Sequence, residues 1–154
     1  MSRNSNLIIN DADYSLAFGE DVTVSNPYNT VFYNIEHRGK VGICEQTPHS
    51  TLHDHGSFAV NVSIVSNAAY TATDTDMVIL CETSTVPSMT INLPSVSTCE
   101  GRIYIIKKIT NDTKTITIDP AGTETIDDMP TYTLSTYNQR VQIVSTSRGW
   151  KIIN

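Results

Sequence analysis

Hydrophobic and polar residues alternate in short runs along most of this chain, which is the pattern of strands that bury one face. The runs are clearest after residue 66, where they recur about every 8 to 14 residues with turn residues between them. They span residues 69–72, 77–81, 89–93, 102–109, 115–118, 131–135, 141–145 and 149–153. Apolar residues do not recur at the spacing of an amphipathic helix. The pattern predicts an all-β chain whose residues 67–154 form a compact antiparallel β-sandwich or barrel-like domain.

Two of the turns between these runs carry side chains of chemical interest. Asp74-Thr75-Asp76 predicts a turn in which the carboxylates accept hydrogen bonds from the backbone. The alternative is a calcium site, which would need about 6 to 8 oxygen ligands. Asn111-Asp112-Thr113 stands between two alternating runs, and this predicts a β-hairpin.

The first 66 residues differ from the rest because their apolar runs are too short to bury a core. Residues 15–19 (SLAFG) are echoed fourteen positions later by residues 29–33 (NTVFY), with an alternating segment at 22–24. Such an echo is typical of short strands stacked coil upon coil, although chance similarity in a chain rich in Ser, Thr and Val would also produce it. Residues 35–66 hold three short runs, at 41–44, 50–53 and 58–65, and we expect these to need a neighbour to pack on.

Composition narrows the classes of partner. The 154 residues include 21 Thr and 15 Ser and carry a net charge of −6. Without a basic stripe the chain is not expected to bind nucleic acid, and without an apolar run of about 18 residues it is not expected to span a membrane. The first residues, MSRNSN, lack the apolar core of a signal peptide. Cys44, Cys81 and Cys99 are therefore expected to be free thiols in a protein made in the cytoplasm.

Several short motifs follow one another in a characteristic order between residues 67 and 154. They are residues 70–76 (YTATDTD), 91–94 (INLP), 101–109 (GRIYIIKKI), 116–122 (ITIDPAG), 125–127 (TID), 132–134 (YTL), 141–145 (VQIVS) and 149–153 (GWKII). In this order they resemble the small β domain near the C-termini of tail-fibre and head-fibre proteins of bacteriophages and some large DNA viruses. Residues 41–60 are similar to the connector that often precedes that domain, except at Cys44-Glu45, where Gly is usual, and at Asp54, where an apolar residue is usual. The echo at 15–33 is similar to the head repeats of trimeric adhesins.

The resemblance implies a homotrimer on the surface of a virion, assembled in the host cytoplasm. Residues 1–34 would dock to the capsid or to another fibre protein, residues 35–66 would form an intertwined trimeric stem, and residues 67–154 would be the outer domain. The expected function is that of a head fibre, capsid-decorating fibre or tail-fibre component, not an enzyme, whose loops adhere to a host surface glycan or protein. A purely structural decoration protein without a host ligand is the alternative, and a polysaccharide-degrading spike is a third.

His53 and His55 form the candidate metal site. In a strand their side chains point to the same side. Three parallel copies around a trimer axis would offer six imidazoles, which suits octahedral coordination of a transition metal such as iron. The resemblance adds weight, since fibre and spike proteins of phages use His-x-His in this way. The plain alternative is a solvated face next to the turn at Gly56, with His49 nearby in sequence.

The remaining chemistry-bearing residues favour structural roles. Hydrolysis of a polysaccharide needs two carboxylates, and the chain offers two candidate pairs, Asp127 with Asp128 and, separately, Asp119 with Glu124. Their surroundings are typical of loops on either side of residue 126. No Gly-x-Ser-x-Gly motif is present. The pair at 107–108 (KK) interrupts an apolar run and is expected to be structural, and Trp150 is expected in the core or at a subunit interface.

Overall fold

The computed structural model describes residues 7–8, 16–20, 23–24, 30–34 and 41–154. The chain divides into two compact units, an N-terminal unit of residues 1–58 and a C-terminal unit of residues 59–154. We keep the name outer domain for residues 59–154, as a label for this second unit. The regular structure of the described residues consists of strands and one short 3₁₀ helix, η1 (Val96–Thr98), so the prediction of an all-β chain is confirmed. Among these residues no helix is long and apolar enough to cross a membrane.

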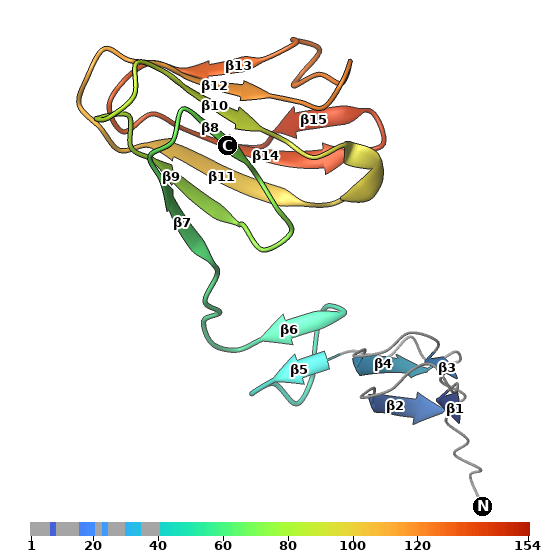
Figure 1. Ribbon diagram of the computed structural model, residues 1–154. Coiled ribbons are helices and arrows are strands. Elements are labelled where there is room, and N and C mark those ends of the chain that lie inside the picture. Colours follow the sequence, from blue (N-terminus) through green and yellow to red (C-terminus); the bar gives the residue numbers. More distant parts are fainter. Residues whose placement is uncertain (1–6, 9–15, 21–22, 25–29, 35–40) are drawn as a thin grey trace, which may run out of the picture. The chain divides into compact units, whose positions relative to one another are not determined.

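The outer domain consists of two sheets that lie one over the other (Figure 1). The order of the five-stranded sheet is β15 (Gly149–Ile152), β14 (Arg140–Thr146), β11 (Ile103–Lys108), β9 (Val78–Cys81) and β7 (Val62–Val65). The order of the four-stranded sheet is β13 (Tyr132–Leu134), β12 (Ile116–Asp119), β10 (Met89–Asn92) and β8 (Ala69–Thr71). The domain begins at residue 59, so β7, which lies in the segment predicted as stem, belongs to the five-stranded sheet.

The chain path explains why both sheets mix parallel and antiparallel strands. From β7 to β12 successive strands alternate between the two sheets, so that neighbours within each sheet run parallel. Antiparallel strands then end this coil: β13 pairs with β12, β14 pairs with β11, and β15 pairs with β14. The predicted antiparallel arrangement is therefore wrong for four of the seven strand pairs of the domain, and neither sheet closes into a barrel.

The predicted hairpin at residues 111–113 is also wrong. β11 and β12, which flank it, lie in different sheets, so the connection crosses from one layer to the other. The alternation of apolar residues sets which face of a strand is buried, but it does not set which strand lies beside it. Asp112 lies in this crossing and forms an ion pair with Lys108.

The core lies between the two sheets of the outer domain. Along β9, β10, β11 and β12 every second residue is buried, as the alternating pattern predicts. Trp150 and Tyr104 are fully buried and stack with their ring centroids 5.6 Å apart, which places Trp150 in the core. The Trp150 indole N–H has no hydrogen-bond partner among the described residues. The aliphatic part of this core includes Ile79, Ile91, Ile106, Ile116, Ile118, Leu134 and Ile143.

The described residues of the N-terminal unit include pairs of short parallel strands. β1 (Leu7–Ile8) pairs with β3 (Thr23–Val24), and β2 (Leu16–Glu20) pairs with β4 (Thr30–Asn34). In the second pair each residue lies beside the one fourteen positions later, as Leu16 beside Thr30, so the stacking predicted from the echo is confirmed. The first residue of each copy and the turn at 38–40 lie outside the described residues, as does much of the predicted docking segment 1–34.

A third parallel pair follows these two in sequence. β5 (Val41–Ile43) pairs with β6 (Leu52–Asp54) through a connection that folds back tightly on Gly42. A Cβ at Gly42 would lie 2.1 Å from the carbonyl oxygen of Glu45, so only glycine fits there. Ile43, Leu52 and Phe58 are 50%, 63% and 75% exposed. This part of the unit therefore leaves its large apolar side chains in water.

Candidate functional site

A broad open hollow lies where the three parallel strands of the five-stranded sheet begin. Its lining comes from residues 60–61 before β7, residues 74–77 before β9, and residues 100–103 at the start of β11. Because parallel strands begin at the same edge of a sheet, these three segments meet there. The hollow has a volume of about 500 Å³. Val60, Met77 and Ile103 give it apolar surface, while Asp74, Glu100 and Arg102 give it charge.

Asp76 forms the buried wall of the hollow and is 4% exposed. Its carboxylate accepts hydrogen bonds from the Ser63 hydroxyl at 2.6 Å, the Tyr70 hydroxyl at 3.0 Å, and the Thr73 amide and hydroxyl at 2.8 and 2.9 Å. Burial alone would raise the pKa of Asp76, but the hydrogen bonds from Ser63, Thr73 and Tyr70 outweigh it and lower the pKa. The predicted turn with a backbone-bonded carboxylate is therefore present at Asp76, which joins β7, β8 and the start of β9.

Arg102 crosses the rim of the hollow. Its guanidinium donates to the backbone carbonyl of Asp74, and Tyr104 donates from its hydroxyl to the carbonyl of Thr73 at 2.8 Å. Burial raises the pKa of Tyr104 to about 12, so this hydroxyl keeps its proton at neutral pH. Arg102 and Tyr104 thus both hold the turn at 73–76 through hydrogen bonds to its backbone carbonyls. Asp74 and Glu100 are exposed at the rim, so the hollow offers carboxylates, a guanidinium and apolar surface to a small polar molecule.

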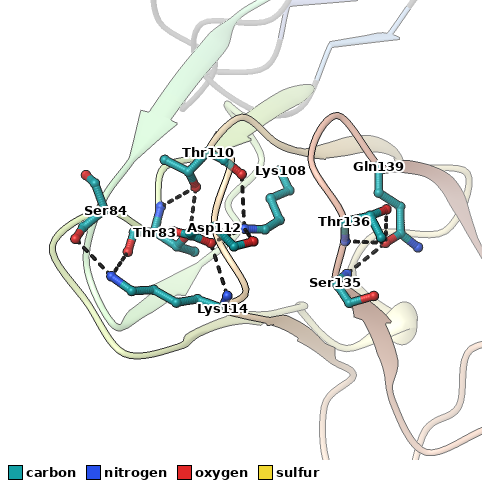
Figure 2. Close-up of polar contacts among 9 residues, drawn as sticks. All are labelled: Thr83, Ser84, Lys108, Thr110, Asp112, Lys114, Ser135, Thr136 and Gln139. Atoms are coloured by element: carbon teal, nitrogen blue, oxygen red, sulfur yellow. Dashed lines mark hydrogen bonds and ion pairs between the residues drawn. The ribbon is translucent and has the colours of Figure 1, made fainter.

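Lys108 is the centre of a second polar cluster, at the opposite end of β11 (Figure 2). Its side chain is fully buried and its ammonium contacts the Asp112 carboxylate, the Thr110 carbonyl at 3.1 Å and the Thr83 hydroxyl at 3.4 Å. Asp112 also accepts from Thr83 at 2.8 Å, and the hydrogen bond from Lys108 lowers its pKa. Lys114 donates to the carbonyl of Thr83 at 2.8 Å. These bonds join the ends of β9 and β11 to the start of β12, and the ammonium of Lys108 has all its contacts within the fold, as the expected structural role requires.

Figure 2 also shows a smaller contact near this cluster, in the turn before β14. The Gln139 side-chain oxygen accepts from the amides of Ser135 and Thr136 at 2.7 and 3.1 Å. Like the Lys108 cluster, this contact satisfies backbone groups between strands.

The candidate catalytic carboxylates are engaged with other parts of the fold. Asp127 and Asp128 lie 3.7 and 3.5 Å from the Lys151 ammonium, in a turn where both residues have positive φ, 47° and 69°. Glu124 accepts from the hydroxyl of Ser95 at 2.6 Å and the amide of Val96 at 3.1 Å, which fixes the start of η1. Asp127, Asp128 and Glu124 therefore each have a contact within the fold, which the hypothesis of a hydrolase did not include.

The three cysteines are free thiols in different surroundings. Cys81 is fully buried, and burial raises the pKa of its thiol to about 12. Cys99 donates from its Sγ to the carbonyl of Ser95 at 3.3 Å, whereas Cys44 is exposed after β5, with φ of 54°. A thiol as deeply buried as Cys81 is unreactive.

The predicted metal ligands lie in and after β6. His53 is half-buried, and its Nδ1 accepts a hydrogen bond from the His49 amide at 3.3 Å, with the two rings 5.7 Å apart. His55 is exposed, and its Nδ1 lies 3.5 Å from a carboxylate oxygen of Glu45, whose pKa is lowered by hydrogen bonds from Thr47. Within one chain, no three His, Cys, Asp or Glu side chains of the described part gather closely enough to hold a metal ion.

The two contacts affect metal binding in opposite ways. At His55, Nδ1 lies beside the Glu45 carboxylate, and a proton held on Nδ1 by that carboxylate would leave the Nε2 lone pair free, as is usual in a metal-binding histidine. At His53, an Nδ1 that accepts from a backbone amide leaves the proton on Nε2 of the neutral ring. The arrangement therefore suits His55 as a ligand, whereas His53 would first have to give up its bond from His49.

The sequence did not predict the hollow, nor the hydrogen-bond partners of Asp76 and Lys108. The hollow is formed by three segments that are distant in sequence, and only the parallel order of β7, β9 and β11 brings them together. One available signal for Lys108 was a charged residue at a position that the alternation predicts to be buried. No protein-family model, curated protein or solved structure matches this chain at a significant level.

Proposed function

We propose that this chain is the subunit of a homotrimeric fibre or spike on a virion surface. The observation that carries the proposal is the contrast within the chain between stacked parallel strand pairs and a compact outer domain. A unit with Ile43, Leu52 and Phe58 half or more exposed is marginal on its own. Association of three copies would supply the missing buried surface. A fibre has this organisation: the stem is stabilised by association of the subunits, and the end domain has a core of its own.

Adhesion to a host surface glycan or protein is the activity that we propose for the outer domain. The hollow at the starts of β7, β9 and β11 supports it, because its rim carries Asp74, Glu100 and Arg102 around apolar surface. Hydrogen-bonding side chains beside an apolar patch suit a sugar or a polar peptide. Three such hollows on one assembly would raise avidity without new contacts.

A decoration protein without a host ligand is the second candidate. One observation favours it: the buried carboxylate of the hollow, Asp76, has its hydrogen bonds within the chain, and Arg102 is bonded to the Asp74 carbonyl. A site built only for structural bonding would have this character. Capsids lacking the protein would then lose stability while host binding stayed unchanged.

The first test is the mass of the purified chain by light scattering behind size exclusion. Three copies of 17.0 kDa, about 51 kDa, are expected. The second test adds labelled protein to host cells and to a glycan array, with Arg102→Ala as the variant and Arg148→Ala, an exposed arginine outside the hollow, as its control. Binding that is lost only with Arg102→Ala supports adhesion. A trimer that binds neither cells nor glycans but stabilises capsids supports decoration, and a 17.0 kDa species at all concentrations contradicts the fibre.

A further inference from the structure

The outward side of the five-stranded sheet is lined with aliphatic side chains. In β9 and β11 the buried residues point toward the four-stranded sheet, so the residues between them point outward. The strand register aligns these outward residues in rows: Val62 lies beside Val78, and Val78 beside Ile105. We name this surface the aliphatic face, and it comprises Val62, Ile64, Val78, Leu80, Ile103 and Ile105.

The aliphatic face is most exposed at β7. Val62 and Ile64 are 52% and 66% exposed, while the four residues on β9 and β11 are partly exposed. β7 is also one of the two edge strands of its sheet, so its outer backbone groups lack a strand partner within the domain. A contiguous apolar surface on an edge strand marks an interaction site or an aggregation hazard.

Two basic residues lie at the end of the same face. Lys107 lies directly opposite Arg140 in the antiparallel pairing of β11 and β14, and Leu80 of the aliphatic face lies beside Lys107. Like charges directly opposite each other in a sheet are unfavourable. Neither cation has an ion pair among the described residues. The face therefore calls for a partner that brings both apolar surface and carboxylates.

A second copy of this chain has that character. Its net charge is −6, and in its outer domain Asp74, Glu82 and Glu100 form no ion pair among the described residues. The face carries no Trp or Tyr, the residues that typically anchor transient partners, and aliphatic surfaces are typical of permanent contacts between subunits. The alternating apolar residues Phe58 and Val60 lead in sequence directly to Val62 and Ile64. Every copy thus has the same apolar row where its stem segment enters the outer domain.

We propose that the aliphatic face, with β7 at its edge, is the contact through which copies of this chain associate. This proposal rests on the trimeric assembly proposed above and names the surface that builds it. The contact buries Val62 and Ile64 against the neighbouring copy, and Lys107 and Arg140 meet carboxylates of that copy.

The test compares two charge insertions at equally exposed apolar residues in the full chain. Ile64→Glu places a carboxylate in the proposed contact, whereas Met129→Glu places one in a loop outside it, at a residue 61% exposed. Sedimentation equilibrium at several concentrations measures the mass. We expect Met129→Glu to keep the wild-type mass and Ile64→Glu to weaken association at least about 100-fold. Circular dichroism verifies that each variant is folded, and Ile64→Ser, expected to weaken association less, replaces Ile64→Glu if that variant is not.

The outcomes separate this proposal from the proposed function. If Ile64→Glu and Ile64→Ser associate as tightly as wild type, the aliphatic face is not the contact, and the trimeric fibre stands on another surface. If Met129→Glu dissociates as readily as Ile64→Glu, the effect is one of added charge and the face is again not the contact. If the wild-type chain is a monomer throughout, both the face and the trimer fall.

Discussion

The two units of this chain solve the problem of burying apolar side chains in different ways. The outer domain encloses a core in which Trp150, Tyr104 and Ile106 are fully buried between two sheets. The N-terminal unit pairs its strands two by two and leaves Ile43, Leu52 and Phe58 exposed. Both use parallel neighbours, but the buried core found among the described side chains lies between the two sheets of the outer domain. The difference indicates that parallel pairing of strands does not by itself let a unit fold in isolation. A second sheet that encloses a core is also needed.

Separating the units should have the largest effect. Residues 59–154 alone are expected to melt cooperatively and to resist protease, since their core is complete. Residues 1–58 alone are expected to show no cooperative transition, because isolated two-stranded sheets are marginal in water. Calorimetry of each fragment and of the full chain measures this. A cooperative transition in the isolated N-terminal fragment would contradict the comparison.

Removing the core aromatic should come next. Trp150→Ala deletes a fully buried side chain stacked on Tyr104, and we expect it to lower the free energy of unfolding by about 3 to 5 kcal/mol. Met129→Ala, at a residue 61% exposed, is the control and should change it by less than about 0.5 kcal/mol. Urea denaturation followed by circular dichroism measures both. Equal effects would show that the outer domain lacks the tight core described here.

Asp76 should give a pH-dependent effect of intermediate size. Because its pKa is lower in the folded chain than the unfolded value of about 3.9, its contribution is fully present above that value and is lost as pH falls through the folded-state pKa. Asp76→Asn removes the carboxylate that Ser63, Tyr70 and Thr73 bond, and should cost about 1 to 3 kcal/mol at pH 7. Melting temperature against pH for both proteins measures this, and the gap should narrow below pH of about 3.9. A gap that stays constant down to acid pH would show that the charge of Asp76 does not matter.

Metal at the N-terminal unit should have the smallest effect. If copies place His55 and His53 around an axis, iron should raise the melting temperature of the assembled chain by a few degrees. His55→Ala should remove the rise, because its Nε2 is the one free for coordination. Ser50→Ala, an exposed neighbour, is the control. Mass spectrometry of the metal content accompanies the melts, and no metal with an unchanged melting temperature would contradict the site.

The positions of the strands were easier to predict from the sequence than the pairing of each strand with another. The run at 77–81 became β9, and that at 102–109 became β11, with the buried faces that the alternation required. The echo at 15–33 even predicted a register, because a repeat fixes which residues stack. Pairing in the outer domain escaped prediction, since alternation within a strand carries no information about whether the next strand joins the same sheet or the opposite one.

The candidate site was harder to predict for the same reason. Asp76 looked like an ordinary turn residue, and nothing near it in sequence indicates that Ser63 lies within 2.6 Å. Lys108 looked like half of a basic pair, although its neighbour Lys107 faces outward while Lys108 is buried. In both cases the partner comes from a strand or crossing that the parallel coil brings close, so the site follows from the topology.

In the outer domain, antiparallel strands follow the coil of parallel strands on one side only. We call this the finished side. Antiparallel β14 and β15 and antiparallel β13 follow the last parallel strands, β11 and β12, whereas the first strands, β7 and β8, are edges without such a finish. Added strand pairs ahead of β7 would therefore lengthen the stack without disturbing its finished side. Each added pair would extend it by about 4.8 Å, the spacing between neighbouring strands. If a segment encoding such a pair were duplicated in the sequence, the stack would lengthen while the order of β11 to β15 stayed as it is.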